Sequence, residues 1–207
     1  MGAKIDAIGL STPGFFRRGS IDMEVKAAKE CLKNAGVDPN LLGLIVNTGI
    51  YRDRHIGEPA IATLIQREIG VNEVFAGDRS TLSFDLTNGG CGLLTGMMVV
   101  DGYLQSGSIE YGMVVTADVD PTPGKTRGYD FTSAAAALLL SRSDQGGGFL
   151  HYRTATDAGF IDDMQGRIEW MEHKGKMRNI LVISQADDYT AACARFALEN
   201  LDVFLKE

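Results

Sequence analysis

The sequence predicts a three-layer α/β/α protein, in which helices cover both faces of a mixed, mostly parallel sheet of five strands. Two observations lead to this prediction. Strand-length apolar runs alternate with segments of helical periodicity over residues 4–143, which is the order found in parallel α/β folds. The 25 glycines recur where apolar runs stop, as tight turns between strands and helices require.

The first predicted elements are a strand at 4–10, a helix at 22–35 and a strand at 42–49. The helix repeats apolar residues at helical spacing, with Ser20 or Asp22 as its N-cap. The run at 42–49 is continuously apolar, which is typical of a parallel strand covered on both faces.

The next three elements are a helix at 58–70, a strand at 80–86 and a helix at 92–105. Pro59 falls in the predicted first turn of the earlier helix, where its missing N–H does no harm. The later helix carries apolar residues at alternating spacings of three and four.

Two further strands are predicted at 111–118 and 133–143, and we expect 146–157 to continue as an edge strand. The tail differs in character. Residues 162–179 are highly charged, whereas 187–207 form one amphipathic helix, for which we expect part of the packing surface to lie outside this chain.

The composition excludes several classes of protein. With 27 acidic against 20 basic residues the net charge is −7, and no basic stripe is available to bind nucleic acid. The longest apolar runs are too short to span a membrane, and the N-terminus lacks the pattern of a secretion signal. We therefore expect a cytoplasmic protein that binds neither nucleic acid nor membranes.

The three cysteines form no paired framework, and the sequence contains no CxxC. We expect no disulfide, no metal site and no cofactor. Cys31 and Cys193 lie in predicted helices, where a small buried hydrophobe is the favoured interpretation.

Cys91 is different, because it lies between Gly90 and Gly92 at the end of a predicted strand and the start of a helix. In parallel α/β sheets, ligand sites lie beyond the carboxyl ends of the strands. The partial positive charge at a helix N-terminus favours a thiolate, and small neighbours let a substrate carbonyl approach. Amide N–H groups near the helix start can hold an oxyanion. The layout favours a nucleophile that forms a thioester over a packed cysteine.

Four stretches resemble the thiolase-fold condensing enzymes, most closely the 3-oxoacyl-[acyl-carrier-protein] synthase III branch. They are "AAKECLKNAGVDPNLLGLIVNTG", "EPAIATLIQREIG", "FDLTNGGCG" and "SGSIEYGMVVTAD", and the similarity runs in order over residues 3–160. The resemblance implies that residues 1–160 are the N-terminal half of the thiolase fold. Residues 161–207 would then be a charged connector and the amphipathic helix.

The resemblance also implies a role for each residue of the cysteine turn. Cys91 would accept the acyl group and its own N–H would help to hold the oxyanion, with Asn88, Gly89, Gly90 and Gly92 beside the substrate. The substrates would be acyl-CoA or acyl-carrier protein, in fatty acid or polyketide biosynthesis. A dimer would form through sheet edges, using the strand before the cysteine.

Three departures from the family leave two hypotheses open. The segment before the first helix is short, and "FTSAAAA" at 131–137 replaces a "GDGAgA" turn. The family's catalytic His and Asn belong to a second half that this chain does not contain, and we interpret His55 as a solvated loop residue rather than their substitute. Either the chain is a condensing enzyme or one subunit of a split one, or it is a non-catalytic homologue with an interaction or scaffolding role. A third, weaker interpretation is a truncated gene product of an ordinary synthase.

Overall fold

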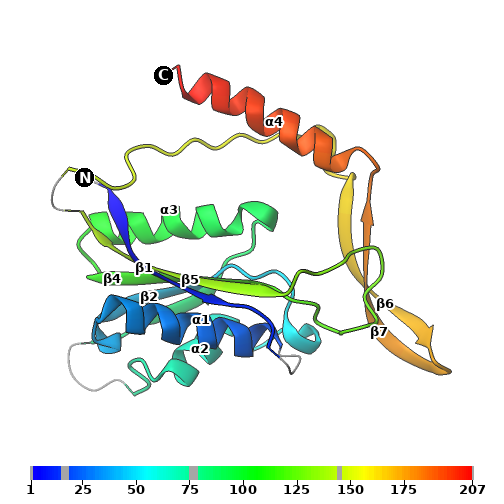
Figure 1. Ribbon diagram of the computed structural model, residues 1–207, viewed down its shortest axis with the longest axis horizontal. Helices are drawn as coiled ribbons and strands as arrows, with labels where there is room; N and C mark the ends of the chain where they lie inside the picture. Colours follow the sequence, from blue (N-terminus) through cyan, green and yellow to red (C-terminus); the bar gives the residue numbers. More distant parts are fainter. Residues whose placement is uncertain (1, 15–18, 75–78, 144–145, 207) are drawn as a thin grey trace. The chain divides into compact units, whose positions relative to one another are not determined.

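The computed structural model describes residues 2–14, 19–74, 79–143 and 146–206 (Figure 1). The chain divides into two compact units, and each is described by itself. The first comprises residues 1–121 and 131–150, and the second comprises residues 122–130 and 151–207. The predicted division of the chain at residue 160 concerns the family's half-fold and stays a prediction.

The first unit contains a mixed sheet in the order β1-β5-β4-β2-β3. Its strands are β1 (Ala3–Ser11), β2 (Leu42–Asn47), β3 (Leu82–Asp85), β4 (Tyr111–Asp118) and β5 (Ala134–Arg142). β2 runs parallel to β3 and β4, whereas β5 is antiparallel to β1 and β4. Four strands therefore point the same way, and the predicted fold class is confirmed.

Helices cover both faces of this sheet (Figure 1). α1 (Ser20–Ala35) and α2 (Ile61–Ile69) lie on one face, and α3 (Gly92–Gln105) lies on the other. The strands present side chains to both layers: Ile45 belongs to the core shared with α1 and α2, and Val46 to the core shared with α3. This is why β2 is apolar at nearly every position.

The start of α1 differs from the prediction. Neither Ser20 nor Asp22 caps the helix, since Gly19 is the N-cap residue and supplies no side-chain hydrogen bond. The Asp53 carboxylate instead accepts hydrogen bonds from the N–H groups of Ser20 at 2.6 Å and Ile21 at 3.2 Å. A residue 33 positions away therefore satisfies the first turn of the helix.

α2 begins at Ile61, so the prediction that Pro59 lies in its first turn was wrong. Residue Ala60 is the N-cap and has no capping side chain. Asp85, at the end of β3, accepts hydrogen bonds from the N–H groups of Ile61 and Ala62. Both helices of this layer thus begin on carboxylates that come from distant parts of the chain.

The second unit consists of a hairpin and a helix: β6 (Met164–His173) pairs antiparallel with β7 (Lys176–Gln185), and α4 (Tyr189–Phe204) follows. The charged segment at 162–179 is therefore mostly strand. The predicted edge strand at 146–157 was wrong, since these residues form no strand. Gly146 and Gly148 have positive φ values of 75° and 93°, which a strand does not adopt.

Candidate functional site

Cys91 lies on a single 3₁₀ turn, Gly89–Cys91, that joins β3 to α3. The turn is at the carboxyl end of β3, as the sequence predicts, and α3 begins at Gly92. The Cys91 side chain is exposed, together with Asn88, Gly89 and Gly90. The thiol is thus accessible to a reagent in solution.

The polar groups of the turn bond mostly to one another. The Cys91 N–H donates to the Asn88 carbonyl at 3.0 Å, and the Gly92 N–H donates to the Gly89 carbonyl. The Asn88 side-chain amide donates to Thr95 Oγ1 at 2.9 Å, and that hydroxyl donates to the Cys91 carbonyl at 3.1 Å. The turn must open before the Cys91 N–H can hold an oxyanion.

The glycines of the turn have different surroundings. A Cβ on Gly89 or Gly90 would meet nothing within 4 Å, so these residues border open space. Gly92 is buried, and a Cβ there would lie 3.2 Å from the Thr48 carbonyl oxygen at the end of β2. Its role in this structure is close packing of α3 against the sheet, whereas Gly89 and Gly90 leave room beside the thiol.

Gly96, one turn further along α3, also lets the helix pack closely against the sheet. A Cβ on Gly96 would lie 2.9 Å from both Thr48 Cγ2 and Val114 Cγ1. We expect Gly96→Ala to lower the free energy of unfolding by about 1–3 kcal/mol, because the helix or the buried strands must shift. Gly102 on the same helix borders open space, so Gly102→Ala should stabilise the protein by about 0.5–1 kcal/mol. Urea denaturation of both variants measures the contrast, and equal effects would contradict it.

Asp85 organises the carboxyl ends of β2 and β3. Its carboxylate forms a 2.7 Å ion pair with Arg52 and accepts a 3.2 Å hydrogen bond from the Asn47 side-chain amide. It also accepts the two N–H groups at the start of α2, from Ile61 at 2.8 Å and Ala62 at 2.9 Å. With its side chain 6% exposed, Asp85 is a buried charge whose acceptor positions are filled.

Glu24 is a buried acid in the same region, only 1% exposed. Among the described residues, neither of its carboxyl oxygens has a hydrogen-bond partner. Glu24 belongs to α1, and its carboxyl group reaches the end of β2, since a Cβ on Gly49 would meet Glu24 Oε1 at 2.7 Å. Burial raises the pKa of Glu24 well above its usual value, and the negative charges of Asp53 and Asp85 raise it further. The folded protein therefore keeps Glu24 in its neutral form to a higher pH than the unfolded chain does.

His55 follows β2 and lies at the same end of the sheet as Cys91. Contrary to the expectation of a solvated loop residue, its ring is half-buried, and its Nε2 is buried without a hydrogen-bond partner in the described structure. Burial lowers the pKa of His55, while the Asp120 carboxylate opposes this shift. No described contact joins His55 to Cys91.

The other two cysteines give a mixed result. Cys31 is buried as predicted, and its thiol donates to the Ala7 carbonyl at 3.4 Å. Burial raises the pKa of Cys31 to about 11, so its thiol stays protonated at neutral pH. Cys193 is exposed on α4, so the prediction of a buried residue was wrong.

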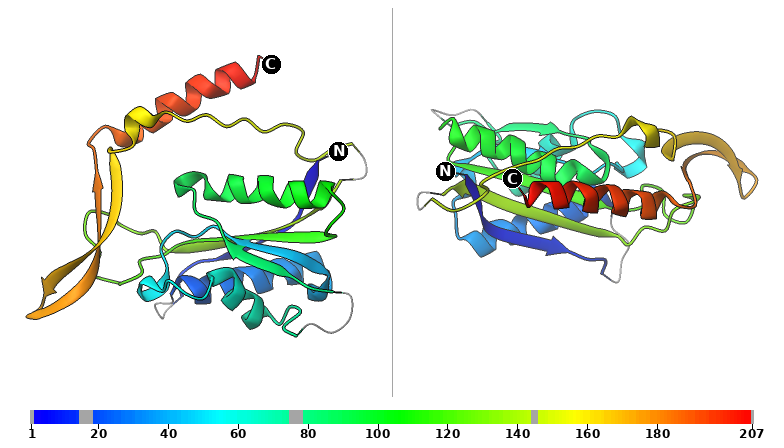
Figure 2. Two further views of the ribbon diagram at one scale, coloured as in Figure 1. Left: turned by 180° about the vertical axis from the view of Figure 1, so that it is seen from behind. Right: turned by 90° about the horizontal axis from the view of Figure 1, so that it is seen from above.

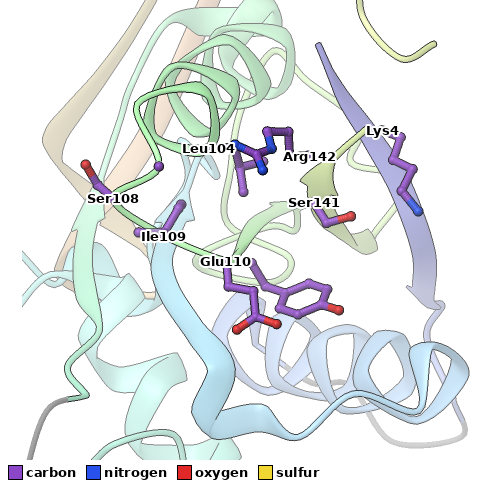
Figure 3. Close-up of a pocket in the computed structure, with 9 residues that line it drawn as sticks. Lys4, Leu104, Ser108, Ile109, Glu110, Ser141 and Arg142 are labelled. Atoms are coloured by element: carbon purple, nitrogen blue, oxygen red, sulfur yellow. The ribbon is translucent and has the colours of Figure 1, made fainter. Parts of the chain in front are cut away.

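A hollow of about 540 Å³ lies at the other end of the sheet (Figure 3). It is bordered by Lys4 near the start of β1, by Tyr111 at the start of β4 and by Arg142 at the end of β5. Because Cys91 follows the carboxyl end of β3, this hollow does not belong to the cysteine turn. Within the described ranges no three His, Cys, Asp or Glu residues could hold a metal ion, and no helix is both long and apolar enough to cross a bilayer.

Comparison with known sequences identifies relatives of larger size. Residues 84–158 match the family 3-oxoacyl-[acyl-carrier-protein (ACP)] synthase III. A beta-ketoacyl-[acyl-carrier-protein] synthase III from Ehrlichia canis is 25% identical over 88% of this chain and 51% of its own length. An acyl-CoA:acyl-CoA alkyltransferase from Shewanella oneidensis is 33% identical over 47% of this chain and 26% of its own. The chain thus spans about half or less of the curated relatives it matches.

Solved structures share the fold. The 3-oxoacyl-[acyl-carrier-protein] synthase III from Aquifex aeolicus aligns with a TM-score of 0.65 and 18% identity, over 86% of this chain and 64% of that one. A variant of OleA from Xanthomonas campestris, with bound lauric acid and lauroyl-CoA, aligns with a TM-score of 0.58 and 16% identity, over 89% and 67%. Residues 84–158 thus match the 3-oxoacyl-[acyl-carrier-protein] synthase III family, and the chain as a whole is similar to part of larger thiolase-like condensing enzymes.

Proposed function

We propose that this chain is an acyl-thioester condensing enzyme, or one subunit of a split one, with Cys91 as the acyl-accepting nucleophile. The observation that carries the proposal is the exposed Cys91 thiol at the carboxyl end of β3 and the start of α3. Acyl-CoA or an acyl-carrier protein would supply the acyl group, in fatty acid or polyketide biosynthesis. A second chain would supply the groups that assist the condensation step.

The acylation step needs only a thiolate and a thioester. The Cys91 sulfur attacks the carbonyl carbon of the acyl thioester and forms a C–S bond, while the bond to the pantetheine sulfur breaks and that thiolate leaves. The oxyanion formed in between requires donors. The Cys91 N–H becomes one of them when the 3₁₀ turn releases it from the Asn88 carbonyl.

The two other cysteines make the acylation testable within one molecule. We expect an acyl-CoA, and separately iodoacetamide, to modify Cys91 at least about tenfold faster than Cys193, because only Cys91 opens a helix. Cys31 should react slowest, since it is buried and protonated. Peptide mapping by mass spectrometry over a time course measures the three rates. Equal rates for Cys91 and Cys193 would count against a nucleophile at 91.

The second candidate is a non-catalytic homologue with an interaction or scaffolding role. Two observations favour it: the Cys91 and Gly92 N–H groups are engaged within the turn, and no described hydrogen bond joins Cys91 to His55, the histidine of the same unit. On this hypothesis Cys91→Ala would leave every biological role of the chain intact. Loss of acyl transfer in that variant would favour the enzyme.

The dimer that we expect from the resemblance would form through β3, the strand before Cys91, which would pair with a strand of the partner. β3 is an edge strand of the sheet and pairs only with β2 in the described structure. An edge strand offers unpaired backbone N–H and C=O groups to a second chain. The partner would be a second copy or the chain that supplies the C-terminal half.

A further inference from the structure

The hairpin of the second unit has an unusual distribution of charge. Its tip carries Lys174, Lys176 and Arg178, all exposed. Its base carries two pairs of aspartates, at 162–163 and 187–188, which flank the ends of β6 and β7. None of these seven side chains forms an ion pair within the described part of the chain. The hairpin, which Figure 2 shows as a long two-stranded ribbon, therefore has a positive tip and a negative base.

The outer edge of β6 is open. Its ten residues pair with β7 on one side, and no other described segment hydrogen-bonds to the opposite side. The outer edge of β7 is different, because Arg127 bridges to it at Val182. β6 thus offers an unpaired row of backbone donors and acceptors to another strand.

The hairpin also exposes apolar side chains. Ile168 is 53% exposed, Trp170 is 69% exposed and Met177 is 57% exposed. Because alternate residues of a strand share a face and Glu172 lies opposite Met177, all three side chains project from the same face. An exposed aromatic residue within such a patch is typical of an interaction surface.

We infer that two copies of this chain pair through the outer edges of their β6 strands, antiparallel and about a two-fold axis. This inference goes beyond the proposed function, since it concerns neither Cys91 nor the β3 edge. Antiparallel pairing brings the positive tip of one hairpin to the negative base of the other, so the charge pattern is self-complementary, as a two-fold interface requires.

The side chains of β6 also select one register. With Ile168 on the axis, Arg167 lies opposite Glu169 of the second copy, and Trp170 lies opposite Gly166. The same register places Lys174 opposite Asp162 of the second copy. An axis one residue earlier or later would oppose Arg167 to Arg167 or Glu169 to Glu169, and like charges directly opposite are destabilising. The register centred on Ile168 is therefore the favoured one.

A charge exchange tests the pairing. The tip variant Lys174→Glu, Lys176→Glu, Arg178→Glu has two negative ends, and the base variant Asp162→Lys, Asp163→Lys, Asp187→Lys, Asp188→Lys has two positive ends. We expect each variant alone to form an assembly with half the molecular mass of the one that the unchanged chain forms. An equimolar mixture of the two variants should recover the full mass. In the mixed pair each negative end of one variant lies beside a positive end of the other. Light scattering after gel filtration measures the masses, and circular dichroism verifies that each variant is folded. A mass that is equal in all samples, including a monomer throughout, would overturn the inference.

Disulfide formation tests the register independently of charge. In a background of Cys91→Ser and Cys193→Ser, Ile168→Cys should oxidise to a covalent dimer, since the two residues at the axis face each other. Trp170→Cys is the matched control, because in this register residue 170 lies opposite Gly166 of the second copy and not opposite residue 170. Equal cross-linking at 168 and 170, or none at 168, would overturn the proposed register.

Discussion

Replacing Glu24 with glutamine should stabilise the protein at neutral pH and leave its stability near pH 4.5 unchanged. The unfolded carboxyl ionises near pH 4.5, whereas burial keeps the folded one protonated to a much higher pH. Above pH 4.5 the folded protein therefore holds one proton more than the unfolded chain. Its stability must fall as the pH rises, by about 1.4 kcal/mol for each pH unit, until the folded carboxyl itself ionises. Glutamine cannot ionise, so the variant lacks this dependence.

The measurement is urea denaturation of both proteins between pH 4.5 and 8, with the difference in unfolding free energy as the readout. We expect a gap in favour of Glu24→Gln that opens above pH 4.5 and widens as the pH rises, until the folded carboxyl ionises. Glu30 is exposed on the same helix, so Glu30→Gln serves as the matched control and should leave the profile unchanged. Parallel profiles for Glu24→Gln and the unchanged protein would mean that Glu24 is ionised in the fold.

Replacing Asp85 with alanine should be among the most destabilising single changes in the first unit. The change leaves Arg52 as an uncompensated charge, with a side chain only 24% exposed, and removes the acceptor for the first N–H groups of α2. Breaking a buried pair in this way lowers the free energy of unfolding by about 3–5 kcal/mol. Urea denaturation measures the loss.

The control is a surface pair of the same kind. Arg67 and Glu68 also lie 2.7 Å apart, with side chains 64% and 47% exposed, so Glu68→Ala should change stability by less than about 1 kcal/mol. A double variant that also replaces Arg52 with methionine should recover part of the loss, because it removes the stranded charge. A loss no larger than that of Glu68→Ala would show that the Asp85 network contributes little.

Elements with a strong periodic signal were predicted well from the sequence. The bounds of β4 and α3 agree with the predicted 111–118 and 92–105. Their apolar residues pack on the sheet core, so the pattern in the sequence and the burial in the structure have the same cause. The position of Cys91 followed directly, because it depends only on where one strand ends and one helix begins.

The hairpin was missed because its turn lacks the usual residues. The loop residues Lys174 and Gly175 have φ values of 51° and 73°, which is the positive-φ pair of a tight hairpin turn. Asparagine or aspartate before glycine signals such a turn, whereas lysine there is uninformative. Charged residues on the exposed strand β6 made 162–179 resemble a connector instead.

The roles of the three acidic residues Asp53, Asp85 and Glu24 could not be predicted, because their contacts are with residues far away in the sequence. Asp53 caps α1 from 33 residues away and Asp85 caps α2 from 24 residues away, so no local pattern announces either cap. The same holds for Glu24. Glu24 lies in a helix with an ordinary amphipathic repeat, and its carboxyl group is buried against Gly49, a contact that the local sequence does not indicate.

The contact of Gly92 and Gly96 with Thr48 has a consequence for how this scaffold can change its ligands. On that side a side chain larger than glycine would press against Thr48, so a larger residue there would cost stability before it reshaped the space around the thiol. Positions 89 and 90 have no such neighbour. On the proposal that Cys91 accepts an acyl group, changes that alter the acyl group it takes would therefore be concentrated in the loop before it, while the helix behind it stays fixed.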